Sequence, residues 1–171
     1  MGSDARGAVF DPDGAYRYRL WRTWDTALPA AAFILLNPST ADASHDDPTL
    51  RRCLGFARAW GYGGVEIVNL FAWRATDPAA LRCCRDPIGP ANDAAILAAV
   101  AGAPLVVAAW GNGGRRHDRA AAVLSLLDGV PLVCLGLTGA DQPRHPLYVP
   151  GATTYEPYDS GWQTARATQA N

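Results

Sequence analysis

The sequence predicts an α/β protein: a three-layer α/β/α sandwich with a central, mainly parallel, four-stranded sheet and an N-terminal β-hairpin. Two observations predict this class. Four short apolar runs, each bounded by turn-forming residues, are typical of strands buried on both faces of a parallel sheet. Segments with helical spacing separate them, so that strand and helix alternate along the chain. The four expected strands cover residues 33–36, 65–71, 105–110 and 131–135.

The hairpin is expected before the first of these strands. Residues 16–24 alternate large apolar and polar side chains, which is the two-residue period of a half-exposed strand. The turn-forming sequence Asp-Pro-Asp-Gly at residues 11–14 precedes them and joins them to a strand at residues 8–10.

Helices are predicted between the strands. The first has apolar residues at helical spacing, an Asp-Pro start and a Gly stop, and the third begins where Asn92 is expected to cap it. The expected segments are residues 49–60, a short helix over 75–81, a helix from Asn92 to about residue 102, and a helix over 116–127.

The length of 171 residues indicates one domain, with a core over residues 8–150 and a loosely packed tail over 151–171. No apolar run approaches the length of a membrane span, and the N-terminus lacks the features of a signal peptide. We therefore expect a cytoplasmic protein without a membrane partner. The net charge of −1 gives no general attraction to nucleic acid. No sequence feature fixes an oligomeric state.

Two residue types exclude several chemistries. All 15 basic residues are arginines, which rules out a lysine Schiff base and a phosphate-loop lysine. The cysteines form no Cys-x-x-Cys pair, so that neither a zinc ribbon nor thioredoxin-type chemistry is expected, and reduced thiols are the default. We expect no cofactor.

Polar side chains follow the predicted parallel strands at the points where they end. Asn37 follows the first strand, Asn69 lies in the second, Trp110 ends the third, and the fourth leads to Arg144 and His145. Strand ends of a parallel sheet lie side by side and are the usual place for a ligand. Two amides suit the edge of a nucleobase, and a histidine can stabilise a developing anion. The alternative is that both asparagines only cap turns.

Other residues near these strand ends have two interpretations. Phe71 and Trp110 are candidates to stack on a base, although aromatic residues are core residues by default. Polar residues after Asn37, including Asp42, crowd the expected pocket mouth. His45, Asp46 and Asp47 could bind a metal, but Asp47 before Pro48 is also explained as a helix cap.

Several motifs together resemble domain-of-unknown-function family 1643, a group of bacterial and phage proteins without an assigned activity. The resemblance covers about residues 8–150. Its motifs are Leu36-Asn37-Pro38-Ser39-Thr40-Ala41-Asp42, Asp47-Pro48-Thr49, Arg51-Arg52-Cys53, Asn69-Leu70-Phe71-Ala72, Arg74-Ala75-Thr76-Asp77-Pro78, Asp86-Pro87-Ile88-Gly89-Pro90, Asn92-Asp93, Ala109-Trp110-Gly111 and Pro143-Arg144-His145-Pro146-Leu147-Tyr148.

The order of strand-end motifs is also similar to that of the uracil-DNA glycosylase superfamily. This resemblance implies that Asn37 positions the attacking water, Asn69 reads the base edge, and His145 stabilises the departing base. It implies a flipped base that stacks on an aromatic residue and leaves by hydrolysis. Leu36 stands where that superfamily usually has glycine, and Leu147 where it has serine.

The sequence thus supports three functions, in decreasing order. The first is a glycosylase-like hydrolase acting on a nucleobase in DNA or a nucleotide, with Arg74 or Arg144 on the phosphate. The second is a nucleotide- or nucleic-acid-binding module without catalysis. The third is a metal-dependent hydrolase that uses His45, Asp46 and Asp47.

Overall fold

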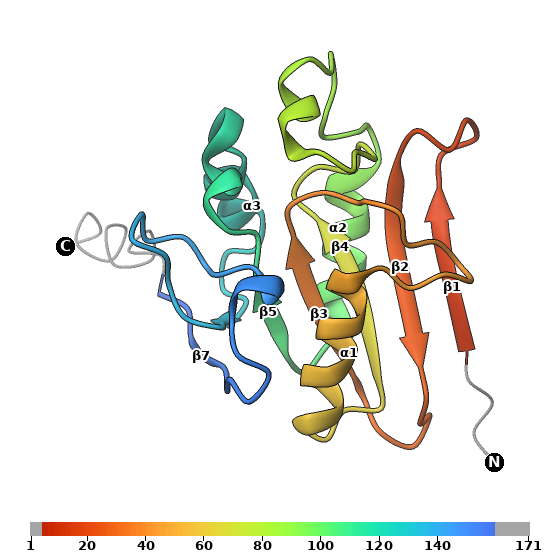
Figure 1. The fold of residues 1–171 in the computed structure, drawn as a ribbon, viewed down its shortest axis with the longest axis vertical. Coiled ribbons are helices and arrows are strands. Elements are labelled where there is room, and N and C mark those ends of the chain that lie inside the picture. Colours follow the sequence, from red (N-terminus) through yellow and green to blue (C-terminus); the bar gives the residue numbers. More distant parts are fainter. Residues whose placement is uncertain (1–4, 160–171) are drawn as a thin grey trace.

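A computed structural model describes residues 5–159 and contains a mixed sheet of seven strands in the order β1-β2-β4-β3-β5-β6-β7 (Figure 1). The predicted α/β class is confirmed. The sheet is larger than the expected four strands, because strands add to both of its edges. The strands are β1 (Ala5–Phe10), β2 (Arg17–Thr23), β3 (Ala30–Leu35), β4 (Gly64–Asn69), β5 (Val106–Ala108), β6 (Val133–Cys134) and β7 (Glu156–Pro157).

The centre of the sheet is parallel and its edges are antiparallel. β4, β3, β5 and β6 pair in parallel with one another, and they match the four apolar runs of the sequence. The β1–β2 hairpin pairs antiparallel with β4, with Leu20 opposite Ile67, and therefore extends the sheet. This pairing covers the edge of β4, whose main-chain groups would otherwise lack partners.

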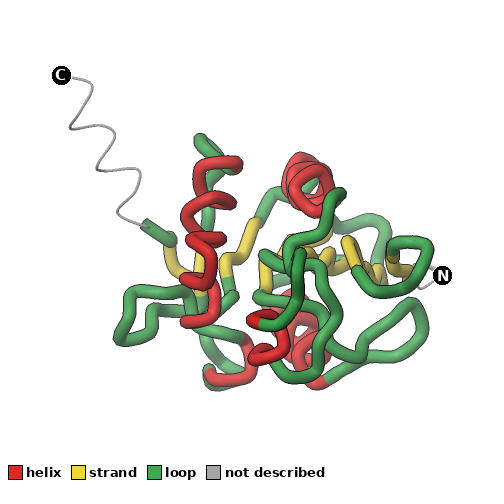
Figure 2. Tube along the Cα trace, turned by 90° about the horizontal axis from the view of Figure 1, so that it is seen from above, coloured by secondary structure: helices red, strands yellow, loops and turns green. Residues whose placement is uncertain are grey.

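Helices cover both faces of the sheet, which lies between them in Figure 2. On one face, Leu50 and Phe56 of α1 (Pro48–Ala59) belong to the same cluster as Phe33 of β3. On the other face, α2 (Asn92–Ala101) and α3 (Arg119–Leu126) join Ile34 in a second cluster. Alternate residues of β3 thus serve opposite cores, as the two-residue period of a strand requires.

The helix predictions are confirmed for α1 and α2, but the cap of α2 and the start of the helix expected at residues 116–127 need correction. Ala91 occupies the cap position of α2, and Asn92 is fully buried as its first residue. The segment before α3 is a 3₁₀ helix, η2 (Asn112–Asp118), which ends at a kink where His117 and Asp118 have φ values of 53° and 52°. These left-handed conformations separate η2 from α3.

Two short 3₁₀ helices lie in the connections, namely η1 (Pro78–Arg82) and η3 (Pro146–Tyr148). η1 replaces the short helix expected at residues 75–81. The segment after residue 150 was expected to pack loosely, but β7 pairs antiparallel with β6, and Tyr158 packs edge-on against Trp110 at 5.9 Å between ring centroids. The rest of that tail, residues 160–171, lies outside the described residues.

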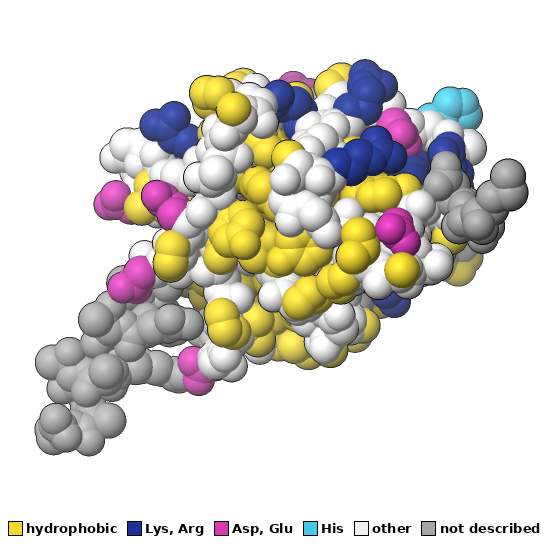
Figure 3. All heavy atoms as spheres, turned by 90° about the horizontal axis from the view of Figure 1, so that it is seen from below, with side chains coloured by type: hydrophobic (Ala, Val, Ile, Leu, Met, Phe, Trp, Pro, Cys, Tyr) yellow, Lys and Arg dark blue, Asp and Glu magenta, His cyan; other side chains and the backbone are white. Residues whose placement is uncertain are grey.

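Figure 3 shows the face of the molecule at the amino edge of the parallel strands. Hydrophobic side chains gather in the middle of this face. Trp60, at the end of α1, packs edge-on against Tyr155, and the guanidinium of Arg58 stacks on Trp24. Within residues 5–159, no helix has both the length and the apolar character needed to cross a membrane.

Candidate functional site

A cleft of about 890 Å³ opens at the carboxyl edge of the parallel strands. Its walls come from the segments that follow β3, β4, β5 and β6 and from the start of α1. The chain runs from β3 to β4 on one side of β3 and then crosses to β5 on its other side. This is a topological switch point, where open α/β sheets leave room for a ligand.

Asn37 lines the cleft directly after β3. Its Nδ2 donates to the carbonyl of Pro38 at 3.0 Å and to that of Ala75 at 2.8 Å. The side chain therefore joins the loop after β3 to the loop after β4, and both hydrogens of Nδ2 are used in these bonds. Its Oδ1 accepts no hydrogen bond from any residue that the structure describes, so that the oxygen is the atom left for a ligand.

His145 lines the cleft from the opposite wall and caps η3. Its Nδ1 accepts a hydrogen bond from the Leu147 amide at 3.3 Å, which leaves the ring proton on Nε2. Burial lowers the pKa of His145 to about 4, against a smaller opposing effect of Asp47. The imidazole is thus neutral at pH 7 and can donate one hydrogen bond from Nε2 without carrying a charge.

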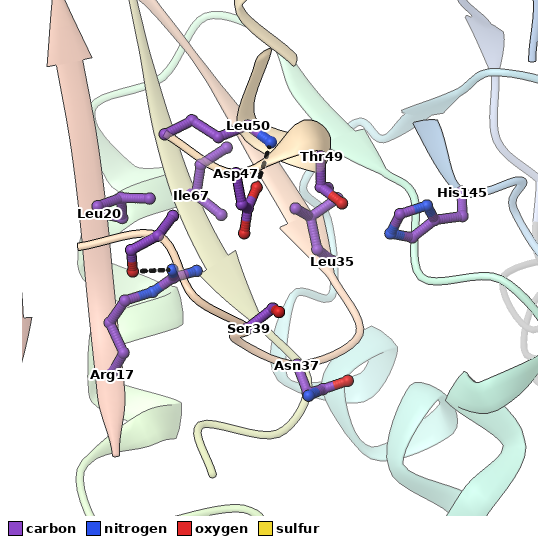
Figure 4. A pocket seen from close by; sticks show the side chains of 11 residues that line it. Arg17, Leu20, Leu35, Asn37, Ser39, Asp47, Thr49, Leu50, Ile67 and His145 are labelled. Atoms are coloured by element: carbon purple, nitrogen blue, oxygen red, sulfur yellow. Dashed lines mark hydrogen bonds between the residues drawn. The ribbon is translucent and has the colours of Figure 1, made fainter. Parts of the chain in front are cut away.

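A recess of about 30 Å³ adjoins the cleft (Figure 4). It shares with the cleft the polar residues Asn37, Ser39, Asp47, Thr49 and His145. Since one water needs roughly 10–15 Å³ of such space, the recess has room for about two waters beside several polar partners.

Asp47 brings a carboxylate to the recess from the start of α1. Its Oδ1 accepts from the amide of Leu50 at 2.7 Å, which confirms the predicted helix cap. The second oxygen accepts no hydrogen bond within residues 5–159. Sequence reasoning treated Asp47 only as a cap or a metal ligand and missed it as a site residue. The missed signal is topological: a helix that follows a parallel strand begins at the carboxyl edge, so its cap residue faces the ligand site.

Four of the residues that the sequence proposed for catalysis or for binding a nucleobase ligand line the cleft, namely Asn37, Trp110, Arg144 and His145. Trp110 is buried with 1% of its surface exposed, which does not fit the expected stacking on a base, and its Nε1 donates to Oε1 of Gln142 at 3.1 Å. Arg144 is exposed, and its Nε donates to the carbonyl of Leu137 at 2.8 Å. Its Nη1 and Nη2 have no hydrogen-bond partner among the described residues.

Asn69 and Phe71 do not line the cleft. The side chain of Asn69 is buried, and its Oδ1 accepts from Nη2 of Arg17 at 3.4 Å. Phe71 lies in the core and meets the ring of His117 edge-on at 6.2 Å. The end of β4 therefore supports the site from below, because its side chains are covered by neighbouring elements.

Arg74 and Asp42 also lie outside the cleft walls. Arg74 stacks on Phe10 and donates to the carbonyl of Gly14 at 3.1 Å. Asp42 accepts from the amides of Ser44 and His45, both at 2.8 Å, and these hydrogen bonds hold its pKa well below the usual range. Arg74 thus supports the β1–β2 turn, and Asp42 supports the turn of its own loop.

The three residues of the metal hypothesis point to different partners. His45 pairs with Asp42, Asp46 pairs with Arg22 at 2.8 Å, and Asp47 caps α1. No group of three or more histidine, cysteine or acidic side chains in residues 5–159 is close enough to hold a metal ion.

Arg116 is a cleft residue that sequence reasoning did not select. It lies in η2, and its Nη1 donates to the carbonyl of Pro78 at 2.6 Å, which joins the η1 and η2 walls. The segment 115–119 has three arginines, which is a signal for anion binding, but its sequence does not show which arginine faces the cleft.

Comparison with known proteins gives a family without an activity. No curated protein and no solved structure matches the chain, and none of the comparisons relates it to the uracil-DNA glycosylase superfamily. A family model described as "Protein of unknown function (DUF1643)" matches residues 17–147, which include Asn37, Asp47, Trp110 and His145. The chain therefore belongs to the DUF1643 family.

Proposed function

We propose that the protein hydrolyses the N-glycosidic bond of a nucleobase-containing ligand, either DNA or a nucleotide, that binds in the cleft. The observation that carries this proposal is the water-sized recess, which places a carboxylate beside a cleft lined by an amide oxygen, an indole and a neutral imidazole. The three-layer arrangement and the positions of Asn37 and His145 at the carboxyl edge of the sheet support the proposed likeness to uracil-DNA glycosylases, which rests on the order of the strand-end motifs.

In this mechanism the recess holds the attacking water. Asn37 Oδ1 accepts one hydrogen bond from the water and orients it. Asp47 takes its proton, because a carboxylate can act as a general base and an amide cannot. The C1′–N bond breaks first, and the negative charge of Asp47 stabilises the oxocarbenium-like sugar that results. The C1′–O bond then forms as the water gives its proton to Asp47. Asp47 thus supplies the base that Asn37 lacks.

His145 acts on the other product. The base leaves with the electron pair of the broken bond, and Nε2–H of the neutral His145 donates a hydrogen bond to the anion that develops on it. The proton that Asp47 took from water returns through solvent to the base, so that the products are a free base and a sugar hydroxyl. Arg144 is placed to contact a phosphate, whereas the ring of Trp110 lines the cleft as a buried residue and has no free face for a base to stack on.

A binding module without catalysis is the second candidate. The observation that favours it is the use of Asn37 Nδ2 in two internal hydrogen bonds, since this atom then joins two loops of the cleft and does not read a base.

Under both proposals we place the protein in the cytoplasm. The four free thiols of Cys53, Cys83, Cys84 and Cys134 support a reducing compartment.

The test is release of free base from a panel of oligonucleotides and nucleotides. The oligonucleotides carry uracil, hypoxanthine or oxidised and alkylated bases, chromatography detects the free base, and alkali cleavage detects abasic sites. Asp47→Asn keeps a side chain that can cap α1 but removes the general base, and we expect release to fall by about 10²-fold or more. Asn37→Ala should also lower the rate.

The matched control is Asp25→Asn. Asp25 accepts from the amide of Ala27 in the turn before β3, so this variant makes the same charge change at the opposite edge of the sheet. It should release base at the wild-type rate. Ligand binding without release across the whole panel would favour the binding module, and full activity of Asp47→Asn would exclude Asp47 as the base.

A further inference from the structure

A buried arginine lies at the recess and has no part in the mechanism proposed above. Arg17, at the start of β2, is only 3% exposed and lines the recess. Its Nη1 donates to the carbonyl of Ala41 at 2.8 Å and its Nη2 to Oδ1 of Asn69 at 3.4 Å. Its Nε has no hydrogen-bond partner in the described part of the chain. Because both acceptors are neutral carbonyl oxygens, no negatively charged group contacts the Arg17 guanidinium directly.

The carboxylate of Asp47 lies on the same recess, as Figure 4 shows. None of the ion pairs within residues 5–159 joins the two side chains directly, and both line the same water-sized space. Burial lowers the pKa of Arg17 to about 10, and Asp47 acts against this effect. The attraction between the two charges therefore acts across the recess.

The other ionisable groups around the pair do not take over this role. Arg22 is paired with Asp46, and Arg74 lies toward Phe10, while both cations lower the pKa of Arg17. On the Asp47 side, burial keeps His145 neutral at pH 7. Burial also raises the pKa of the Cys53 thiol, which keeps that group uncharged.

We infer that Arg17 is a positioning residue whose buried charge acts on the Asp47 carboxylate across the recess that both side chains line. Its catalytic meaning rests on the proposed function, because an ionised Asp47 is the base that takes the proton from water. The coupling between the two side chains is a property of the protein alone. It can be measured without a substrate.

The experiment is a titration of the Asp47 carboxyl group by ¹³C NMR in the full chain. An opposite charge within a few ångströms typically shifts a carboxyl titration by one to three pH units. We therefore expect Arg17→Met to raise the Asp47 midpoint by about one unit or more. Arg17→Lys keeps the charge and should leave the midpoint within a few tenths of a unit. An unchanged midpoint in a folded Arg17→Met variant would overturn the inference.

The matched control is Arg19→Met, on the same strand. Arg19 pairs with Glu66 and lies outside the recess, so its removal changes the net charge equally and should leave the Asp47 midpoint unchanged. An equal shift in both variants would mean a general charge effect and would also overturn the inference.

A reciprocal measurement covers the case in which Arg17→Met does not fold. Asp47→Asn retains a capping side chain and removes the negative charge, and coupling between two sites is reciprocal. In this variant we expect the ¹H–¹⁵N signal of Arg17 Nε to move and its proton to exchange several-fold faster. An Arg17 signal identical to that of the wild type would contradict the coupling.

The two proposals fail in different ways. If the titration shifts but no base is released from any substrate, the Arg17–Asp47 coupling stands and the proposed reaction falls. If base is released and depends on Asp47, but the titration does not shift, the reaction stands and the role of Arg17 falls. If base release and the Arg17–Asp47 coupling are both observed, the acid limb of the pH–rate profile should move with the NMR midpoint of Asp47 in Arg17→Met.

Discussion

Asn92 donates a hydrogen bond of 2.9 Å from its side-chain Nδ2 to the main-chain carbonyl of Asn69, and thereby ties the start of α2 to the end of β4. The same nitrogen donates to the carbonyl of Leu70 at 3.0 Å. Because Asn69 also contacts Arg17, this buried amide helps to fix the strand end beneath the recess. A residue expected to cap a helix is thus part of the support of the site.

Asn92→Ala should lower the free energy of unfolding by about 1–3 kcal/mol. Both carbonyls lose a donor in a buried environment, although Leu70 keeps one from Arg119. Urea unfolding followed by fluorescence measures the change. Asn112→Ala makes the same truncation at an exposed position and should change stability by only about 0.5 kcal/mol or less. Equal losses in the two variants would contradict the role assigned to Asn92.

The centre of the fold could be predicted because local signals and burial agree there. The apolar runs of β3 and β4 and the capped, periodic sequence of α1 each have one consistent interpretation. β7 could not be predicted, because two residues that include Pro157 carry no strand signal, and their pairing depends on the edge that β6 offers. The kink at His117 and Asp118 likewise depends on contacts outside its own sequence.

The candidate site follows the same division. Asn37 and His145 could be found because each is placed by a strand end or by neighbouring prolines, and both face the cleft. Asn69 and Phe71 belong to the same kind of strand end, yet other elements bury them. Arg17 comes from a hairpin that the sequence does not connect to the site, and only the antiparallel pairing of β2 with β4 brings it there.

Substitutions of Asp47 should separate its structural role from its chemical role. Asp47→Ala removes the acceptor for the Leu50 amide and should cost about 0.5–2 kcal/mol of stability. Asp47→Asn retains an acceptor at the cap and should cost less, while both variants lack the carboxylate. Chemical denaturation and base release, measured on the same samples, test this. Equal destabilisation by the two variants would show that the charge, and not the cap, stabilises α1.

The burial of His145 should make stability depend on pH. The unfolded chain binds a proton at this residue below about pH 6.5, whereas the folded protein does so only near pH 4. The contribution of His145 to the free energy of unfolding is therefore fully present above pH 6.5 and is lost as the pH falls toward 4. In this range the free energy of unfolding falls by up to about 1.4 kcal/mol per pH unit because of this group. His145→Asn keeps a capping side chain and should lack this component.

The comparison of wild-type and His145→Asn unfolding curves between pH 7.5 and 4 (about three points per unit) isolates the contribution of His145, because the carboxylates titrate in both proteins. An NMR titration of the imidazole gives its midpoint directly, expected near 4. Parallel stability profiles for the two proteins, or an imidazole that titrates near its ordinary value, would contradict the buried neutral histidine on which the proposed leaving-group contact depends.

The two arginines considered for phosphate binding should behave differently, since only Arg144 lines the cleft. Arg144→Ala should weaken the binding of a 5′-nucleotide by about 10- to 100-fold, because a charge-assisted hydrogen bond contributes about 1.5–3 kcal/mol. Arg74→Ala should leave the dissociation constant within about twofold and instead lower stability, because Arg74 packs on Phe10 and bonds Gly14. Calorimetric titration together with thermal unfolding resolves the two effects.

If Arg74→Ala, while still folded, weakened binding as much as Arg144→Ala, the phosphate would have to lie toward the β1–β2 turn. The base would then enter the cleft from the side of Ala75, and not from the side of His145.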